Sequence, residues 1–271
     1  MITKDKEFIL FIDSGIGGLS ILKYFLSLKE NANIIYFADN YNFPYGAKSE
    51  DDIADILLNI YSALKDEFRI SLIVIACNTA SVNAIDILRS AEGVPQIVGT
   101  VPAIKTAASQ TKNNKIGVIA TESTIKQNYI QNLIAKFAKN KEVFLKSSHK
   151  LVEAAENFYP TDIVKNIVAE ELSYFKEVGI DSLVLGCTHY SFLFEEIEEF
   201  FGKNVKIIDS REGVAKRISS VAPGSVFNDN PDKILFLSKK DKETLKKYSK
   251  FNEILNIFQL IDFKEIFHFK S

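Results

Sequence analysis

Two cysteines are the residues with the greatest chemical potential in this sequence. Cys77 and Cys187 are the only cysteines among the 271 residues, and each follows a short apolar run and precedes polar residues that can open a helix. The amino end of a helix favours negative charge and lowers a thiol pKa from its ordinary value of about 8.5. Free cysteine is also often buried as a packing residue. The equivalent positions of the two residues nevertheless predict a pair of thiols that face each other across a cleft.

Several chemistries are compatible with two such thiols. A redox disulfide is one, although the pair does not form a Cys-x-x-Cys motif, and a cysteine hydrolase with His189 as the base for Cys187 is another. A metal site would need further ligands, and His149, His189 and His268 lack zinc-finger spacing, so we expect no metal. In the last option, one thiolate removes a proton from carbon and the opposite thiol protonates the other face. That reaction inverts a stereocentre and needs no cofactor.

A glycine-rich loop follows the first apolar run and reads Asp13-Ser14-Gly15-Ile16-Gly17-Gly18. It lacks the third glycine of the dinucleotide fingerprint, because Ser20 stands there, and it lacks the Gly-Lys-Ser/Thr of a nucleoside triphosphate loop. The loop is either a tight turn capped by Asp13 or an opening that admits a small ligand to backbone N–H groups. In the second case Asp13 lies beside the reacting centre.

The elements that must position these residues are short strands and amphipathic helices in alternation. Strands are predicted at residues 8–12, 34–37, 72–76, 96–98, 116–119, 143–145, 183–185, 205–208 and 234–237, and helices at 53–68, 124–138, 161–178 and 192–201. Several strands are apolar on both faces, which is typical of a covered parallel sheet. The alternation predicts a doubly wound α/β protein, whose ligands lie beyond the carboxyl ends of the strands.

A weak internal repeat in the sequence predicts two domains. The segment 73–79 resembles the segment 183–189, since both are an apolar strand, a small residue, a cysteine and two polar residues. We therefore expect two doubly wound α/β domains of similar topology, with the active site in the cleft between them. The first comprises residues 1–98 plus 209–271, and the second comprises residues 99–208.

Composition limits the partners of the chain. Hydrophobic residues make up 46 % and charged residues 25 %, which is ordinary for a globular protein. The net charge of −2 gives no electrostatic footprint for nucleic acid or an anionic membrane. No apolar run approaches the roughly 20 residues of a membrane span, and the first seven residues do not resemble a secretory signal. We expect a cytoplasmic protein with a small-molecule substrate and no nucleic-acid or membrane partner.

Four blocks of the sequence, in this order, resemble those of glutamate racemase. They are Phe11-Ile12-Asp13-Ser14-Gly15-Ile16-Gly17-Gly18, Pro44-Tyr45-Gly46, Ala76-Cys77-Asn78-Thr79-Ala80-Ser81 and Leu185-Gly186-Cys187-Thr188-His189-Tyr190. The resemblance implies a cofactor-independent racemase, without pyridoxal phosphate, that makes D-glutamate for bacterial peptidoglycan. The family commonly forms homodimers.

The resemblance also implies roles for individual residues. Cys77 would take the α-proton of D-glutamate while Cys187 protonates the opposite face, and the two exchange roles for L-glutamate. Asp13 matches the acid beside the first thiol, and Glu153 matches the glutamate that works with His189 beside the second. Asp13 and His189 are also expected near the substrate, together with the matching contact positions Ser14, Tyr45, Gly46, Asn78, Thr79, Thr121 and Thr188.

Two segments depart from the family pattern. Thr100-Val101-Pro102-Ala103 stands where the family usually has a Glu-Pro pair, and Ser147-Ser148-His149-Lys150 replaces a stretch that contains Cys-Pro. His149 and Glu153 are four residues apart, so a surface pair on one helix face accounts for His149. The alternatives to a glutamate racemase are an aspartate racemase and a catalytically silent protein that binds an acidic amino acid.

Overall fold

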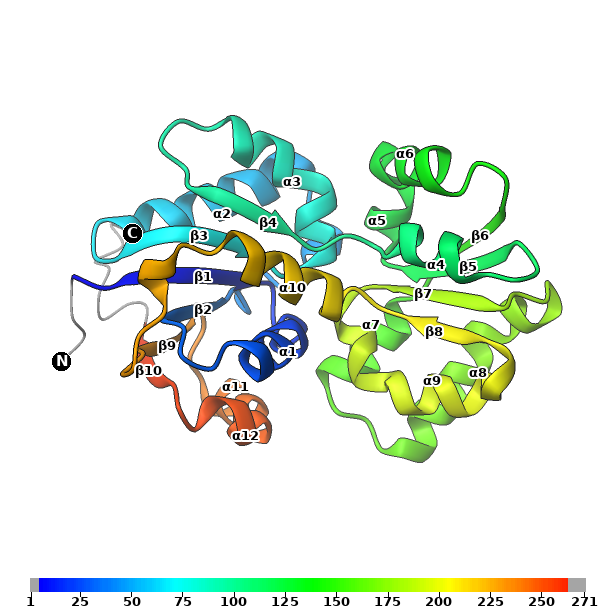
Figure 1. Ribbon diagram of the computed structural model, residues 1–271. Coiled ribbons are helices and arrows are strands. Elements are labelled where there is room, and N and C mark those ends of the chain that lie inside the picture. The colour runs from blue at the N-terminus through cyan, green and yellow to red at the C-terminus, as the bar shows by residue number, and fades with distance from the viewer. Residues whose placement is uncertain (1–4, 263–271) are drawn as a thin grey trace.

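The computed structural model describes residues 5–262, which form two parallel β-sheets covered by helices (Figure 1). The segment 1–4, part of the stretch compared with a secretory signal, and His268 lie outside the described residues. Within residues 5–262, no helix is long and apolar enough to cross a membrane.

The first sheet has six strands in the order β10-β9-β2-β1-β3-β4, and every pairing is parallel. Its strands are β1 (Glu7–Asp13), β2 (Ile34–Ala38), β3 (Arg69–Ile75), β4 (Gln96–Gly99), β9 (Lys233–Leu237) and β10 (Gln259–Asp262). Strand β1 is central and almost wholly buried, because its residues are apolar on both faces.

The second sheet has four parallel strands in the order β6-β5-β7-β8. Its strands are β5 (Lys115–Ala120), β6 (Glu142–Ser147), β7 (Ser182–Gly186) and β8 (Lys206–Ile208). The order repeats the β2-β1-β3-β4 part of the first sheet, which confirms the expected doubly wound α/β fold with two units of similar topology. Strands β3 and β7 occupy equivalent places, and a cysteine follows each of them.

Helices cover both faces of each sheet. The longer ones are α1 (Leu19–Leu28), α2 (Glu50–Lys65), α3 (Asn78–Ser90), α6 (Asn128–Phe137), α7 (His149–Glu156), α8 (Thr161–Glu177), α9 (Phe194–Phe201) and α10 (Arg211–Val221), and the shorter ones are α4 (Ile104–Gln110), α5 (Glu122–Lys126), α11 (Lys242–Tyr248) and α12 (Asn252–Leu255). Helices α1, α10 and α12 share one core with the first sheet, and α2 and α3 share the core on its opposite face. Helices α7, α8 and α9 pack on one face of the second sheet, and α4 and α6 pack on the other.

All nine predicted strands are present, and β10 is an additional strand. The helix predicted over residues 124–138 is two helices, α5 and α6, because Gln127 between them has an extended backbone, with a ψ of 138°. The side chain of Gln127 donates to Glu50 and Asn83, both in the first part of the chain.

The chain crosses between the sheets twice. It leaves the first sheet after β4, and it returns after β8, where Val214, Ala215 and Ile218 of α10 join the core of the first sheet (Figure 1). The domain boundaries at 98/99 and 208/209 stay a prediction.

Candidate active site

The loops after β1 and β7 come from different sheets and meet at atomic contact. A Cβ atom added to Gly17 would lie 2.3 Å from Oγ1 of Thr188 and 2.8 Å from Nδ1 of His189. The Thr188 hydroxyl donates to Oδ2 of Asp13 over 3.5 Å. Only glycine fits at position 17, so the glycine-rich loop serves the close approach of two chain segments.

Cys77 lies at the N-cap of α3, just beyond strand β3, and its side chain is buried, with 7 % of the residue exposed. The Ser14 hydroxyl lies 4.0 Å from its Sγ atom. Burial raises the pKa of the Cys77 thiol, and the charges of Asp13 and Cys187 raise it further, while the Ala80 N–H lowers it. The sequence-based expectation of a lowered pKa is therefore wrong for Cys77, because desolvation outweighs the helix end.

Cys187 directly follows β7 and belongs to a short buried polar chain. Its Sγ atom lies 3.7 Å from Nδ1 of His189, and Nε2 of His189 lies 2.8 Å from Oε2 of Glu156. Burial alone would lower the pKa of His189, but its hydrogen bonds with Cys187 and Glu156 hold that pKa well above its ordinary value. Since the charge of Cys187 also acts on Cys77, the two thiols share one electrostatic environment.

Glu153 does not take the place expected for it beside His189. Its side chain is 49 % exposed, and its Oε1 atom lies 3.4 Å from Nδ1 of His149, which confirms the predicted surface pair. Glu156, one helical turn further along α7, has a side chain only 5 % exposed and contacts His189. Glu156 is the last residue of α7 and is buried there, whereas Glu153 lies one turn earlier at the surface.

Asp13 ends strand β1 and is completely buried. Its Oδ1 atom accepts a hydrogen bond of 2.8 Å from the Gly15 N–H. Burial raises the pKa of the Asp13 carboxyl to about 6, although the positive charge of His189 and the Gly15 N–H both lower it. A carboxyl with a pKa near neutrality suits proton transfer beside a thiol.

The expected substrate contacts include hydroxyl groups that come from both halves of the chain and lie together. Thr79 in α3 and Thr121, the N-cap of α5, have hydroxyl oxygens 3.0 Å apart, and Thr124 joins them. Asn78 donates weakly to the Thr100 carbonyl over 3.4 Å, while its Oδ1 atom is buried without a hydrogen-bond partner in the described part of the chain. A buried unpaired acceptor is costly, so this oxygen is suited to a donor on a ligand.

Tyr45 and Gly46, in the segment after β2, lie next to these residues. The Tyr45 hydroxyl donates to Oδ2 of Asp39 over 2.8 Å, and burial raises the pKa of Tyr45 well above its ordinary value. A Cβ atom added to Gly46 would lie 3.7 Å from the side chain of Thr121, so the loop after β2 also reaches the second half of the chain.

Sequence reasoning missed four residues of this region: Phe43, Thr124, Glu156 and Lys247. Phe43 packs against His189, with ring centroids 5.8 Å apart. Glu156 had one usable signal, its spacing of four residues from the apolar Val152, which places both on one helix face. Lys247 contacts Oε1 of Glu156 over 2.7 Å, from a segment without a distinctive motif.

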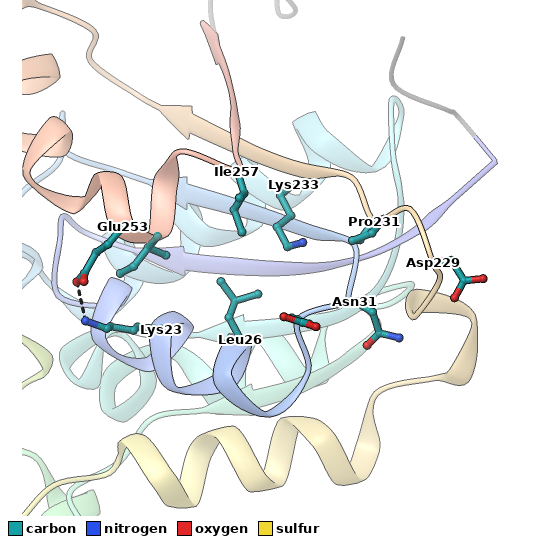
Figure 2. Close-up of a pocket in the computed structure, with 10 residues that line it drawn as sticks. Lys23, Leu26, Asn31, Asp229, Pro231, Lys233, Glu253 and Ile257 are labelled. Carbon is teal, nitrogen blue, oxygen red and sulfur yellow. Dashed lines mark hydrogen bonds and ion pairs between the residues drawn. The ribbon is translucent and has the colours of Figure 1, made fainter.

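A separate surface cavity of about 460 Å³ lies between α1 and the β9–α12 region (Figure 2). Lys23, Leu26 and Lys233 line it, and none of the predicted site residues does. Within residues 5–262, no group of three or more His, Cys, Asp or Glu residues could hold a metal ion.

Comparison with known proteins identifies the family of the chain. The sequence model described as Asp/Glu/Hydantoin racemase matches residues 25–217. The glutamate racemase of Sphingopyxis alaskensis is 41 % identical over 81 % of this chain and 83 % of its own length.

Two crystal structures of glutamate racemases have the same fold. The enzyme from Escherichia coli, in complex with L-glutamate and the activator UDP-MurNAc-Ala, has a TM-score of 0.84 and 31 % identity, with 95 % of this chain and 97 % of the other covered. The enzyme from Francisella tularensis, in complex with D-glutamate, has a TM-score of 0.77 and 31 % identity, with 97 % and 100 % covered. The chain therefore belongs to the Asp/Glu/Hydantoin racemase family and, within it, groups with the glutamate racemases.

Proposed function

We propose that this protein interconverts L- and D-glutamate by a two-thiol mechanism without a cofactor. The observation that carries the proposal is the pair of buried cysteines, each at the carboxyl end of an equivalent strand and each with its own acidic or basic neighbours. Asp13 and Ser14 accompany Cys77, and His189 and Glu156 accompany Cys187. The D-glutamate formed would supply peptidoglycan synthesis.

The reaction begins with ionisation of one thiol. For L-glutamate, the Cys187 proton passes to Nδ1 of His189, and the imidazolium so formed is stabilised by the Glu156 carboxylate. The thiolate then takes the α-proton, so that the C–H bond breaks, an S–H bond forms and the electron pair stays on the α-carbon. The Cys77 thiol returns a proton to the opposite face and becomes a thiolate, to which Asp13 gives its own proton. After product release, the extra proton on His189 is lost to solvent and Asp13 takes a proton from solvent, which restores the starting state.

The developing carbanion needs positioned donors and a site that excludes water. Both thiols and all the surrounding polar residues named above are buried or nearly so, and a low dielectric strengthens each interaction. The unpaired Oδ1 of Asn78 is suited to the substrate ammonium. The hydroxyls of Thr79, Thr121 and Thr188 are suited to the carboxylates.

The test is circular dichroism of L-glutamate incubated with exhaustively dialysed protein. The ellipticity should decay to zero as the racemate forms, without added pyridoxal phosphate or divalent metal. Aspartate at the same concentration is the matched substrate, and it should react far more slowly. Activity that appears only after a cofactor is added would contradict the two-thiol mechanism, and faster aspartate turnover would contradict the assigned substrate.

A cytoplasmic location and a homodimeric assembly complete the proposal, and both come from the resemblance to the family. Light scattering after size-exclusion chromatography measures the assembly directly. A mass near twice the 30.5 kDa of the chain is the expected result.

A further inference from the structure

A lysine from the C-terminal part of the chain touches the acid that accompanies the second thiol. Nζ of Lys247 lies 2.7 Å from Oε1 of Glu156, while the other oxygen of that carboxylate faces His189. Successive side-chain contacts connect Lys247 to Glu156, Glu156 to His189 and His189 to Cys187. These contacts join α11, which follows a strand of the first sheet, to α7 beside the second sheet (Figure 1).

Helix α11 is held firmly enough to position this lysine. The Asp241 side chain caps it by accepting from the Thr244 N–H over 2.8 Å, and the Thr244 hydroxyl accepts from Asn40 over 3.3 Å. Tyr248, next to Lys247, is buried. Lys247 itself is partly accessible, with a side chain 23 % exposed, so its amine reaches a buried carboxylate from the protein surface.

A buried carboxylate needs such a partner. Glu156 has a side chain only 5 % exposed, and its desolvation favours the protonated form, which would no longer stabilise an imidazolium. His189 and Lys247 together hold the pKa of Glu156 below its ordinary value. The charged groups around His189 are Asp13, Glu156 and Cys187, and Lys247 is the cation that acts through Glu156.

We propose that Lys247 is a positioning residue for the Cys187 half of the reaction: it fixes one oxygen of Glu156 and keeps that carboxylate charged and aimed at His189. The proposal rests on the two-thiol function described above. It assigns a role to a segment after Phe227 in which the sequence shows no motif. Because Lys247 contacts neither thiol, its loss should affect proton removal by Cys187 and spare proton removal by Cys77.

Racemisation itself is a poor readout of this asymmetry, because the two enantiomers have equal free energy and kcat/KM must stay equal in both directions. Elimination from a glutamate analogue with a leaving group on the β-carbon is irreversible, so each enantiomer reports on its own thiol. The L-configured analogue reports on Cys187, and the D-configured analogue reports on Cys77.

The experiment compares Lys247→Met, Lys247→Arg and the control Lys246→Met, which alters an exposed neighbour on the same helix. Lys247→Met should slow elimination from the L-configured analogue about tenfold, less than the 10²–10⁴-fold typical of a group that itself transfers the proton. It should change the D-configured reaction by less than about twofold. Lys247→Arg should restore most of the rate, because a guanidinium also binds a carboxylate, and Lys246→Met should match the wild type.

Equal slowing with both enantiomers, or no slowing, would overturn the proposal, as would a failure of arginine to rescue. Lys247→Gln replaces the methionine variant if circular dichroism shows that the latter is unfolded. Failure of the proposed function is a different result, since the wild-type protein would then neither racemise glutamate nor eliminate from either analogue.

Discussion

The Oε2 atom of Glu156 lies 2.8 Å from Nε2 of His189, and both side chains are about 95 % buried. This contact makes Glu156, and not Glu153, the acid that controls the protonation of His189. A buried carboxylate–imidazole pair stabilises the imidazolium that forms when a neighbouring thiol ionises. The raised pKa of His189 is consistent with this, because its hydrogen bonds with Cys187 and Glu156 and the Glu156 charge favour the charged imidazole.

Paired variants in α7 test this assignment. Glu156→Gln should slow elimination from the L-configured analogue about 10²-fold, because the amide cannot balance the imidazolium charge. Glu153→Gln should leave the rates with both enantiomers within about twofold, since its carboxylate lies at the surface beside His149. Rates are compared at saturating analogue, with circular dichroism as the check of folding. A larger loss with Glu153→Gln than with Glu156→Gln would restore the original assignment.

The sequence predicted the framework of the site well, because local patterns determine it. Nine strands follow from apolar runs, and the carboxyl ends of parallel strands share one edge, so Asp13, Cys77 and Cys187 were expected near ligands. The strand β10 at Gln259–Asp262 lies at the sheet edge and lacks a strong apolar run. Its pairing with β9 is a tertiary effect that sequence pattern does not carry.

Sequence patterns do not show which of two glutamates, three residues apart in α7, contacts His189. Glu153 follows the Leu-Val pair that matches the family motif, whereas the placement of α7 in the folded chain decides which acid reaches His189. Lys247 is more remote still, at 91 residues from Glu156. The raised pKa of Cys77 could not be predicted either, because it depends on how deeply the folded chain buries the thiol and on the charge of Asp13 beside it.

The raised pKa of Asp13 predicts a pH dependence of stability. The folded chain holds the Asp13 proton up to a pH of about 6, and the ordinary value is 3.8. Between these values only the unfolded chain has lost the proton, so stability falls as the pH rises through this window. At about 1.4 kcal/mol per pKa unit, the loss amounts to about 3 kcal/mol.

Asp13→Asn removes this titration while retaining an acceptor for the Gly15 N–H. The free energy of unfolding of the variant minus that of the wild type should therefore rise by about 2 kcal/mol between pH 4 and pH 6.5, which is most of the total. Denaturant unfolding at several pH values measures the difference, in which titrations common to both proteins cancel. A flat difference would mean that Asp13 titrates alike in the folded and unfolded chains. The variant should also slow elimination from the D-configured analogue, since Asp13 accompanies Cys77.

Gly17 tests the close approach of the two loops. In Gly17→Ala the new methyl group would lie 2.3 Å from Oγ1 of Thr188, so the loops must separate and move His189. We expect kcat for racemisation to fall at least tenfold, because a displacement of about 1 Å in an active site can cost about 10²-fold. Gly213→Ala in α10 is the control, since nothing lies within 4 Å of its Cβ position. It should keep full activity and gain up to about 1 kcal/mol of stability from helix propensity. Equal activities of the two variants would show that the two loops can accommodate a methyl group at position 17.

The cysteines provide the most direct test of the mechanism. In a two-thiol reaction each face of the α-carbon has its own acid/base group, so replacing either thiol by the far less acidic serine hydroxyl should reduce racemisation by about 10³-fold or more. The partial reactions should separate: Cys187→Ser keeps elimination from the D-configured analogue, and Cys77→Ser keeps elimination from the L-configured one.

Both serine variants should stay folded, because exchange of sulfur for oxygen leaves almost no cavity in the core. Each variant thus serves as the control for the other, with the same chemical change at two equivalent strand ends. Full racemase activity in both would make the cysteines packing residues. Action of both variants on the same enantiomer would require a single base to reach both faces of the α-carbon. Opposite enantiomer preferences in the two variants would instead assign one face of the α-carbon to each sheet, with Cys77 after β3 and Cys187 after β7.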